Sequence, residues 1–318
     1  MREEQGSREA ERSETIGTDN MIINQGNLAT LFTGFKASFQ TGFAGHSSVW
    51  QQIATEVPSS TKAEKYAWLG QMPNMREWIG DRQVHNIAAS DYQITNKKFE
   101  LTIGVPRDDI DDDTYGVYTP LFQEMGRSSS ALPDQLVFGL LKAGFTEKCY
   151  DGLPFFSTTH KVLDKAGKEQ NVSNSGGGAG AAWFLLDTSR ALKPLIFQKR
   201  RAFEFVKKDD PKKSDEVFDS DVYTYGVDGR CNVGFGFWQM AYGSKAALDK
   251  ANFRAARTAL MKMTGDYAKP LGIWPKLLLV GPSNGDAARD IILADREAGG
   301  ATNTDRNLVT IMETPWLD

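Results

Sequence analysis

The sequence predicts an α+β fold, and three segments support that prediction. Between Phe99 and Val105, apolar residues alternate with polar or small ones, which is the two-residue period of a half-buried strand. The segment that follows repeats apolar residues every three or four positions, as an amphipathic helix does. From Lys245 onward, short helical and strand patterns alternate. With 318 residues, 40% of them hydrophobic, the chain can bury one large core or two ordinary ones.

The predicted helix runs from about Thr114 to Ala143. Its apolar face consists of Tyr118, Leu121, Phe122, Met125, Leu132, Leu136, Leu140 and Ala143. Such a helix is ~45 Å long, with Pro120 tolerated in its first turn and Pro133 expected to kink or break it. The acidic run 107–113 lacks the glycine and glutamate of an EF-hand loop. We therefore interpret it as a helix cap and not as a calcium site.

An extended arm is predicted for the region that leads from Trp68 into the strand at 99–105. Pro73 and Asn74 mark a turn between two apolar stretches. Strands of about a dozen residues on either side of the turns would reach ~40 Å, too far to fold into one small core. The alternative is an ordinary three-stranded meander with Trp68 and Trp78 in the protein's own core, and the sequence leaves both open.

The N-terminal segment has two parts. Residues 1–20 hold nine charged side chains and no aromatic one, so they are predicted to be disordered. An upstream translation start, a cloning remnant and an arm that orders only on assembly all agree with that composition. Order is expected from Met21, followed by a helix over residues 26–39 that docks elsewhere in the structure. One face of this helix is marked by Leu28, Leu31, Phe32, Phe35 and Phe39.

Charge and cysteine content disfavour several classes of partner. The formal net charge is −4, which provides no electrostatic drive to wrap nucleic acid. No apolar run approaches the ~20 residues that span a membrane. Cys149 and Cys231 have no CxxC spacing, and no secretory signal accompanies them, so we expect buried thiols in a reducing compartment and no disulfide.

Residues 161–180 are predicted to form an inserted flexible loop. They are polar and end in the glycine-rich run 176–180, which lacks both the GxGxxG spacing of a dinucleotide site and the GK[ST] ending of a phosphate loop. Two strand-rich segments, 181–206 and 217–244, lie on either side of a charged turn.

The C-terminal part is predicted to be a small α/β unit. A helix around residues 253–263 precedes a buried strand at 277–282, a second helix at 287–294 and a strand at 308–312. The turn after the first strand does not supply the glycine spacing of a Rossmann fold.

No catalytic, cofactor-binding or metal-binding residue is predicted. None of the three histidines, His46, His85 and His160, falls in a nucleophile, zinc or phosphate-transfer motif. Cys149 and His160 would pair only if the loop between them folds back, and a buried, inert cysteine is the expected alternative. The chain is therefore not expected to be an enzyme.

Several long segments carry a family resemblance. They are WLGQMPNMREWIGDRQVHNIAASDYQITNKKFELTIGVPRDDIDDDTYGVYTPLFQEMG from residue 68, CYDGLPFF from 149, LLDTSRALKPLIFQ from 185 and GFGFWQMAYGSKAAL from 234. Together they resemble the major head subunit of Mu-like phages and prophages. The resemblance covers most of the chain from Met21, leaving out residues 1–20 and the loop 161–180.

The resemblance implies the Hong Kong 97-type phage major capsid protein fold. In that plan, residues 21–60 would be the N-terminal arm and 61–105 the extended loop. Residues 106–244 would be the peripheral domain, with a spine helix at 114–144 and most of the later strands. Residues 245–318 would be the axial domain.

The implied function is that of a major capsid protein, which self-assembles as hexamers and pentamers into an icosahedral shell around phage double-stranded DNA. Assembly in the host cytoplasm, a scaffold or protease, a portal, and weak non-specific DNA contact would accompany it, with no cofactor and no membrane. The predicted inter-subunit residues are Trp68, Met72, Arg76, Glu77, Trp78, Ile79, Asp81 and Arg82. The alternatives are a small-molecule enzyme using the C-terminal α/β unit, and another phage structural protein of the tail or decoration type.

Overall fold

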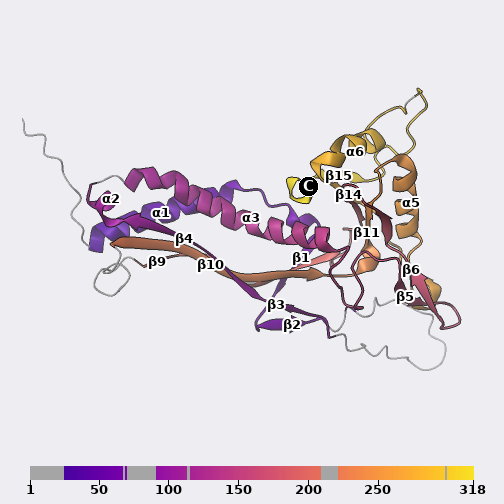
Figure 1. The fold of residues 1–318 in the computed structure, drawn as a ribbon, viewed down its shortest axis with the longest axis horizontal. Helices are drawn as coiled ribbons and strands as arrows, with labels where there is room; N and C mark the ends of the chain where they lie inside the picture. The colour runs from indigo at the N-terminus through magenta and orange to yellow at the C-terminus, as the bar shows by residue number, and fades with distance from the viewer. Residues whose placement is uncertain (1–24, 67–68, 70–90, 113–114, 209–220, 298) are drawn as a thin grey trace, which may run out of the picture.

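The molecule has an elongated half and a compact half, joined by one long helix (Figure 1). The computed structural model describes residues 25–66, 69, 91–112, 115–208, 221–297 and 299–318. Helix α3 (Thr119–Ala143) runs along the elongated half and ends at the compact half. It is continuous through Pro133, so of the kink or break predicted at this proline, the break is wrong. The predicted starting residue, Thr114, lies outside the described residues.

A four-stranded sheet forms the floor of the elongated half. Its order is β1 (Ala54–Pro58), β9 (Leu195–Lys208), β10 (Val222–Phe235) and β4 (Lys97–Pro106). Only β1 and β9 are parallel. Strand β4 confirms the predicted alternation, but it pairs with β10 along its whole length. It is therefore part of this sheet, although the family resemblance assigns its first nine residues to the extended loop 61–105.

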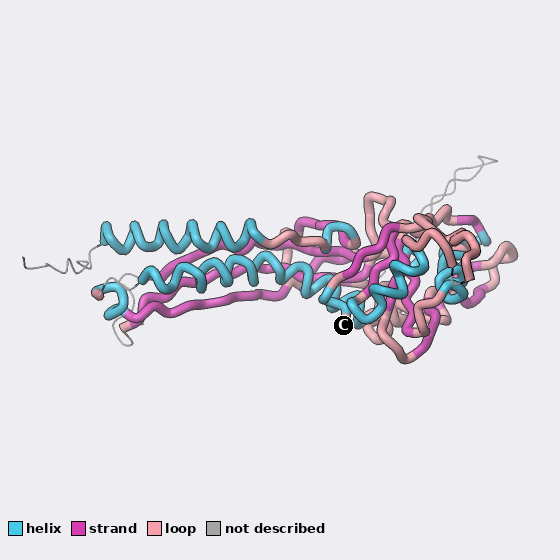
Figure 2. The backbone as a smooth tube through the Cα atoms, turned by 90° about the horizontal axis from the view of Figure 1, so that it is seen from above, coloured by secondary structure: helices cyan, strands magenta, loops and turns pink. Residues whose placement is uncertain are grey.

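Two helices cover one face of that sheet, as Figure 2 shows from above. Helix α1 (Gln25–Gly45) confirms the predicted N-terminal helix, and it lies beside α3. The rings of Phe35 and Phe122 stack with their centroids 4.3 Å apart, and those of Phe39 and Phe205 at 5.2 Å. Burying a side chain of this size stabilises the fold by roughly 1.5–3 kcal/mol. The short helix α2 (Arg107–Asp111) closes the far end of the layer.

The compact half is built on a five-stranded mixed sheet. Its order is β15 (Thr310–Glu313), β14 (Leu277–Val280), β8 (Trp183–Leu186), β11 (Ala241–Lys245) and β7 (Ser175–Gly178). Strand β8 is central and buried at all four residues. The strands between 181 and 244 are therefore divided between two sheets. Strand β8 pairs with β11 and with the C-terminal strand β14, whereas β9 and β10 belong to the four-stranded sheet.

The segment 161–180 contains more regular structure than predicted. Strands β5 (His160–Leu163) and β6 (Glu169–Val172) form an antiparallel hairpin. Residues 175–178 then add β7 to the edge of the five-stranded sheet. The polar sequence resembled a loop because β6 and β7 lie at exposed edges.

The predicted C-terminal elements are confirmed as α5 (Lys250–Met261), β14, α6 (Gly285–Ile292) and β15. Strands β14 and β15 are parallel. A two-residue pair, β12 (Thr264–Gly265) and β13 (Lys269–Pro270), follows α5. No helix among the described residues has a segment long and apolar enough to cross a bilayer.

Candidate assembly surfaces

The predicted inter-subunit residues all lie outside the described residues. These are Trp68, Met72, Arg76, Glu77, Trp78, Ile79, Asp81 and Arg82. The structure does describe the two short strands that flank the segment 67–90, which carries these residues. We call this pair of strands the root of the segment. Strands β2 (Ala63–Lys65) and β3 (Gln93–Thr95) pair antiparallel on either side of it.

A buried amide holds this root against the long sheet. The Gln198 side chain on β9 donates to the Ile94 carbonyl at 3.0 Å and to Asn96 Oδ1 at 2.9 Å. Its Oε1 accepts a hydrogen bond from the Tyr66 hydroxyl at 2.8 Å. Gln198 is fully buried, so these bonds are shielded from water. The chain therefore leaves the sheet at a fixed position on both sides of residues 67–90.

A carboxylate stabilises the turn before β2. Glu64 accepts hydrogen bonds from the backbone amides of Ser60 and Thr61 and from the Ser59 hydroxyl, at 2.9, 3.1 and 2.9 Å. These bonds favour the charged form and lower the pKa of Glu64 to about 2, with the Ser60 amide contributing most.

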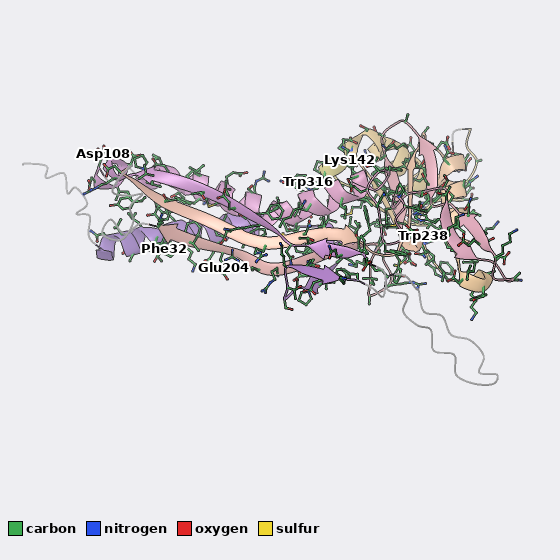
Figure 3. The ribbon with its side chains drawn as sticks, turned by 60° about the horizontal axis from the view of Figure 1, so that its bottom comes forward. Phe32, Asp108, Lys142, Glu204, Trp238 and Trp316 are labelled. Atoms are coloured by element: carbon green, nitrogen blue, oxygen red, sulfur yellow. The ribbon has the colours of Figure 1, made fainter. Side chains whose placement is uncertain are left out.

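The face of the long sheet opposite the helices carries charges in rows. Tyr223, Tyr225 and Val227 of β10 are buried among the helix residues. Because strand residues alternate between faces, Asp228 and Arg230 lie on the other side. Figure 3 labels Phe32 on the helix layer and Glu204 on β9 of this sheet.

The strand register places like charges next to one another across three strands. Lys98, Arg230 and Arg201 are directly opposite one another on β4, β10 and β9. The adjacent row consists of Glu100, Asp228 and Glu204. We call these six residues the charged rows. Like charges directly opposite one another destabilise a sheet, and ion pairs between the two rows offset that cost.

Two such ion pairs converge on Asp228. Arg201 contacts its carboxylate directly, and Lys98 Nζ lies 3.9 Å from Oδ2. At the basic end of the rows, the sheet has a hollow of about 610 Å³ lined by Asn96, Lys98, Arg200, Arg201 and Arg230. The face is therefore basic on one side and acidic on the other, which suits a partner that also carries both signs.

The charged rows were not predicted, because the residues come from three segments, and Lys98 and Arg230 are 132 positions apart in the sequence. A signal existed in the two-residue spacing of opposite charges in Lys98-x-Glu100 and Asp228-x-Arg230. Each spacing places both charges on one face of a strand. Only the strand pairing aligns the two signals.

Cys149 and His160 do approach each other, with a carboxylate between them. Asp151 Oδ1 lies 3.1 Å from Cys149 Sγ, and Oδ2 lies 2.5 Å from His160 Nδ1. Burial, followed by the Asp151 charge, raises the pKa of the Cys149 thiol well above its usual range. Burial opposes ionisation of Asp151, but the hydrogen bond from His160 and the other favourable interactions together outweigh burial and lower its pKa. A thiol held protonated in this way is a poor nucleophile.

Solved phage structures share the fold of nearly the whole chain. A chain of the procapsid of bacteriophage JBD30 matches with a TM-score of 0.81 and 46% identity, covering 93% of this chain and 100% of that one. A chain of the JBD30 capsid matches with a TM-score of 0.74 and 34% identity, covering 94% and 100%. The protein is therefore a phage capsid subunit with the Hong Kong 97-type fold.

The chain belongs to the Mu-like prophage major head subunit gpT family, whose model matches residues 28–317. The Mu-like prophage FluMu major head subunit of Haemophilus influenzae is 44% identical over 273 residues, which cover 83% of this chain and 88% of that protein. The major capsid protein of Escherichia phage Mu is 39% identical over 297 residues, covering 91% and 96%. The chain is thus a structural protein of the virion head and not an enzyme, as predicted.

Proposed function

We propose that this protein self-assembles as hexamers and pentamers into an icosahedral shell that encloses double-stranded phage DNA. The observation that supports this most directly is the match of nearly the whole chain to a subunit of the JBD30 procapsid. Assembly would take place in the cytoplasm of the bacterial host, with a scaffold or protease and a portal as partners. The formal charge of −4 leaves room only for weak, non-specific contact with the packaged DNA.

The two sheets support the following domain plan, which we propose. Residues 21–60 would form the N-terminal arm, and the extended loop would end at Asn96 instead of Val105. The peripheral domain would comprise α3 as spine helix with β4, β9 and β10, and β1 of the arm would add the fourth strand to its sheet. The axial domain would comprise residues 245–318 together with β7, β8 and the β5–β6 hairpin.

The extended loop would contact a neighbouring subunit. Trp68, Met72, Trp78 and Ile79 would be its apolar anchors, because buried aromatic side chains carry most of an interface's energy. Its charged residues would select the register. They have both signs, in Arg76-Glu77 and Asp81-Arg82, as do the charged rows on the sheet. We propose the charged rows of the neighbour as the surface that receives them.

Negative-stain electron microscopy with sedimentation velocity of the purified chain tests the proposed function. Closed shells or separate hexamers and pentamers are expected, and a scaffold protein would be added where the chain alone stays small. The JBD30 capsid has also been seen decorated with minor capsid protein trimers, so a decoration partner is a further component to add. A chain that remains monomeric with its scaffold, at every salt concentration, would contradict the proposal.

A further inference from the structure

Three potential metal ligands meet in the compact half of the molecule. Cys149 Sγ, a carboxylate oxygen of Asp151 and a ring nitrogen of His160 all lie within 4.8 Å of one another. This is the one such group of three found among the described residues. Its chemistry of thiol, imidazole and carboxylate is the donor set that zinc prefers. None of the three belongs to the proposed assembly surfaces.

The ligands sit on well-defined backbone. Cys149 and Asp151 lie in a tight turn, in which the Cys149 amide donates to the Leu153 carbonyl at 2.8 Å and Gly152 has a φ of 79°. The left-handed backbone at Gly152 favours glycine. His160 begins β5, and its ring stacks on Trp238 at 4.0 Å with an interplanar angle of 4°. Trp238 is labelled in the compact half in Figure 3.

The hydrogen bonds of His160 call for a cation beside it. Its Nε2 lies 3.2 Å from the Phe155 carbonyl oxygen and its Nδ1 lies 2.5 Å from Asp151 Oδ2. Both neighbours are acceptors, whereas a neutral imidazole donates from only one nitrogen. In either neutral tautomer, the lone pair of one ring nitrogen faces a lone pair of an acceptor oxygen. The ring is fully buried, so water does not separate them. A metal ion bound at Nδ1, with the ring N–H at Nε2 donating to the Phe155 carbonyl, removes that conflict.

The arrangement around Nε2 is the one that metal-binding histidines use. Such histidines donate the other ring N–H to a carbonyl or carboxylate, which fixes the tautomer and the ring plane. Here the Phe155 carbonyl takes that place, and it is held in turn by the Asn174 amide at 2.8 Å. In this tautomer, Nδ1 presents its lone pair toward the thiol and the carboxylate.

We propose that Cys149 Sγ, His160 Nδ1 and one oxygen of Asp151 bind a single Zn²⁺ ion. Expected bond lengths are ~2.3 Å for sulfur and ~2.0–2.2 Å for nitrogen and oxygen. In a tetrahedral site with these bond lengths, nitrogen and oxygen lie ~3.4 Å apart and sulfur lies ~3.6 Å from either, so Asp151 must move away from Nδ1 by about 1 Å. The Asp151 side chain is 23% exposed, so water can complete the fourth position from that side.

Binding would displace protons in a balanced step. Zn²⁺ replaces the thiol proton of Cys149 and binds the Nδ1 lone pair of a neutral imidazole whose N–H is at Nε2. One proton therefore passes to solvent for each ion bound. The ion would link the turn after α3 to the β5–β6 hairpin, and so join the spine helix to the compact half.

Metal content and cobalt spectroscopy of the untagged full-length chain test this inference. Cys231, which is also buried but lies on β10 outside the cluster, provides a matched control. After incubation with excess zinc and gel filtration, about one zinc per chain is expected in the wild type and in Cys231→Ala, and none in Cys149→Ala. Cobalt should give a thiolate charge-transfer band in the first two proteins only.

Two results would overturn the inference: a wild-type chain without stoichiometric zinc, or Cys149→Ala retaining as much as the wild type. If Cys149→Ala does not fold, the cobalt spectra of the wild type and Cys231→Ala test the inference instead. If neither protein shows the thiolate charge-transfer band, Cys149 is not a metal ligand. Zinc binding is measured on the unassembled chain, so it can fail while shells still form, and shells can fail to form while zinc still binds.

Discussion

Gly126 of α3 lies so close to Phe39 of α1 that a Cβ atom at Gly126 would be 2.0 Å from the Phe39 carbonyl oxygen. One turn away, a Cβ at Gly42 of α1 would be 1.8 Å from the carbonyl oxygen of Gln123. The two helices therefore touch through their backbones at a pair of glycines. This contact sets how closely α1 and α3 lie over the long sheet.

Replacing Gly126 by alanine should force the helices apart. A methyl group there meets backbone, which cannot rotate away, so we expect a loss of about 1–3 kcal/mol in the free energy of unfolding. Gly139, also in α3, is the control, because a Cβ atom added there would have no neighbour within 4 Å. Gly139→Ala should leave stability unchanged or raise it by about 0.5–1 kcal/mol. Urea unfolding measures both, and equal effects would refute the backbone contact.

Asp134 of α3 secures the chain after α1. Its Oδ1 accepts from the Val49 and Trp50 amides at 3.0 and 2.8 Å, and its Oδ2 lies 2.8 Å from His46 Nε2. Because Asp134 is fully buried, Asp134→Ala leaves several donors unpaired and should cost about 3 kcal/mol in urea unfolding. Glu124→Ala, which removes an exposed pair with Arg127 on the same helix, should cost under about 1 kcal/mol. Similar losses would contradict this role.

The Glu64 turn should weaken in acid. The folded pKa of Glu64 is about 2, below its ordinary value of 4.5. The stabilisation is therefore fully present above about pH 4.5 and is lost as the pH falls from there through 2. Carboxyl-carbon NMR should show a Glu64 midpoint near 2 in the wild type. Ser59→Ala, which removes one hydrogen bond, should raise that midpoint, and a wild-type midpoint near 4.5 would refute the capping role.

Reversing one charge in the rows should affect assembly more than folding. Arg230→Glu places a carboxylate near Asp228 on the open face, so we expect shells to be lost while the circular dichroism spectrum is unchanged. Lys165→Glu makes the same kind of charge reversal on the exposed β5–β6 turn and should still assemble. Particle yield by sedimentation separates the two variants. If Arg230→Glu forms normal shells, the charged rows are not part of the interface between subunits.

Trp78→Ala should stop assembly and leave the subunit folded, because loss of a central aromatic anchor typically costs an interface about 2 kcal/mol or more. Trp78→Phe, which keeps an aromatic ring, should retain part of the particle yield. Electron microscopy gives the yield, and circular dichroism reports the fold. A Trp78→Ala chain that loses solubility and helix signal together would place this residue in the subunit's own core, as the meander alternative expects.

Local patterns predicted most of the elements. The three- and four-residue spacing around Phe122 and Met125 located α3, and the alternation from Phe99 to Val105 located β4, because both patterns depend on neighbours in sequence. The break expected at Pro133 was wrong, since α3 remains continuous there with the neighbouring Asp134 fully buried. The hairpin at 160–172 was missed because its polar strands resemble a loop.

The sequence by itself determined helices α1, α3, α5 and α6, the long strands β4, β9 and β10, the family and the role of a shell subunit. It could do so because periodicity and long matching segments are properties of the chain order alone. Only the tertiary structure decided which strands share a sheet, as with β8 and β14, and which charges form the rows around Asp228. The tertiary structure also decided that Cys149, Asp151 and His160 lie together. Such groupings depend on strand register and on the burial of distant side chains, which no short stretch of sequence encodes.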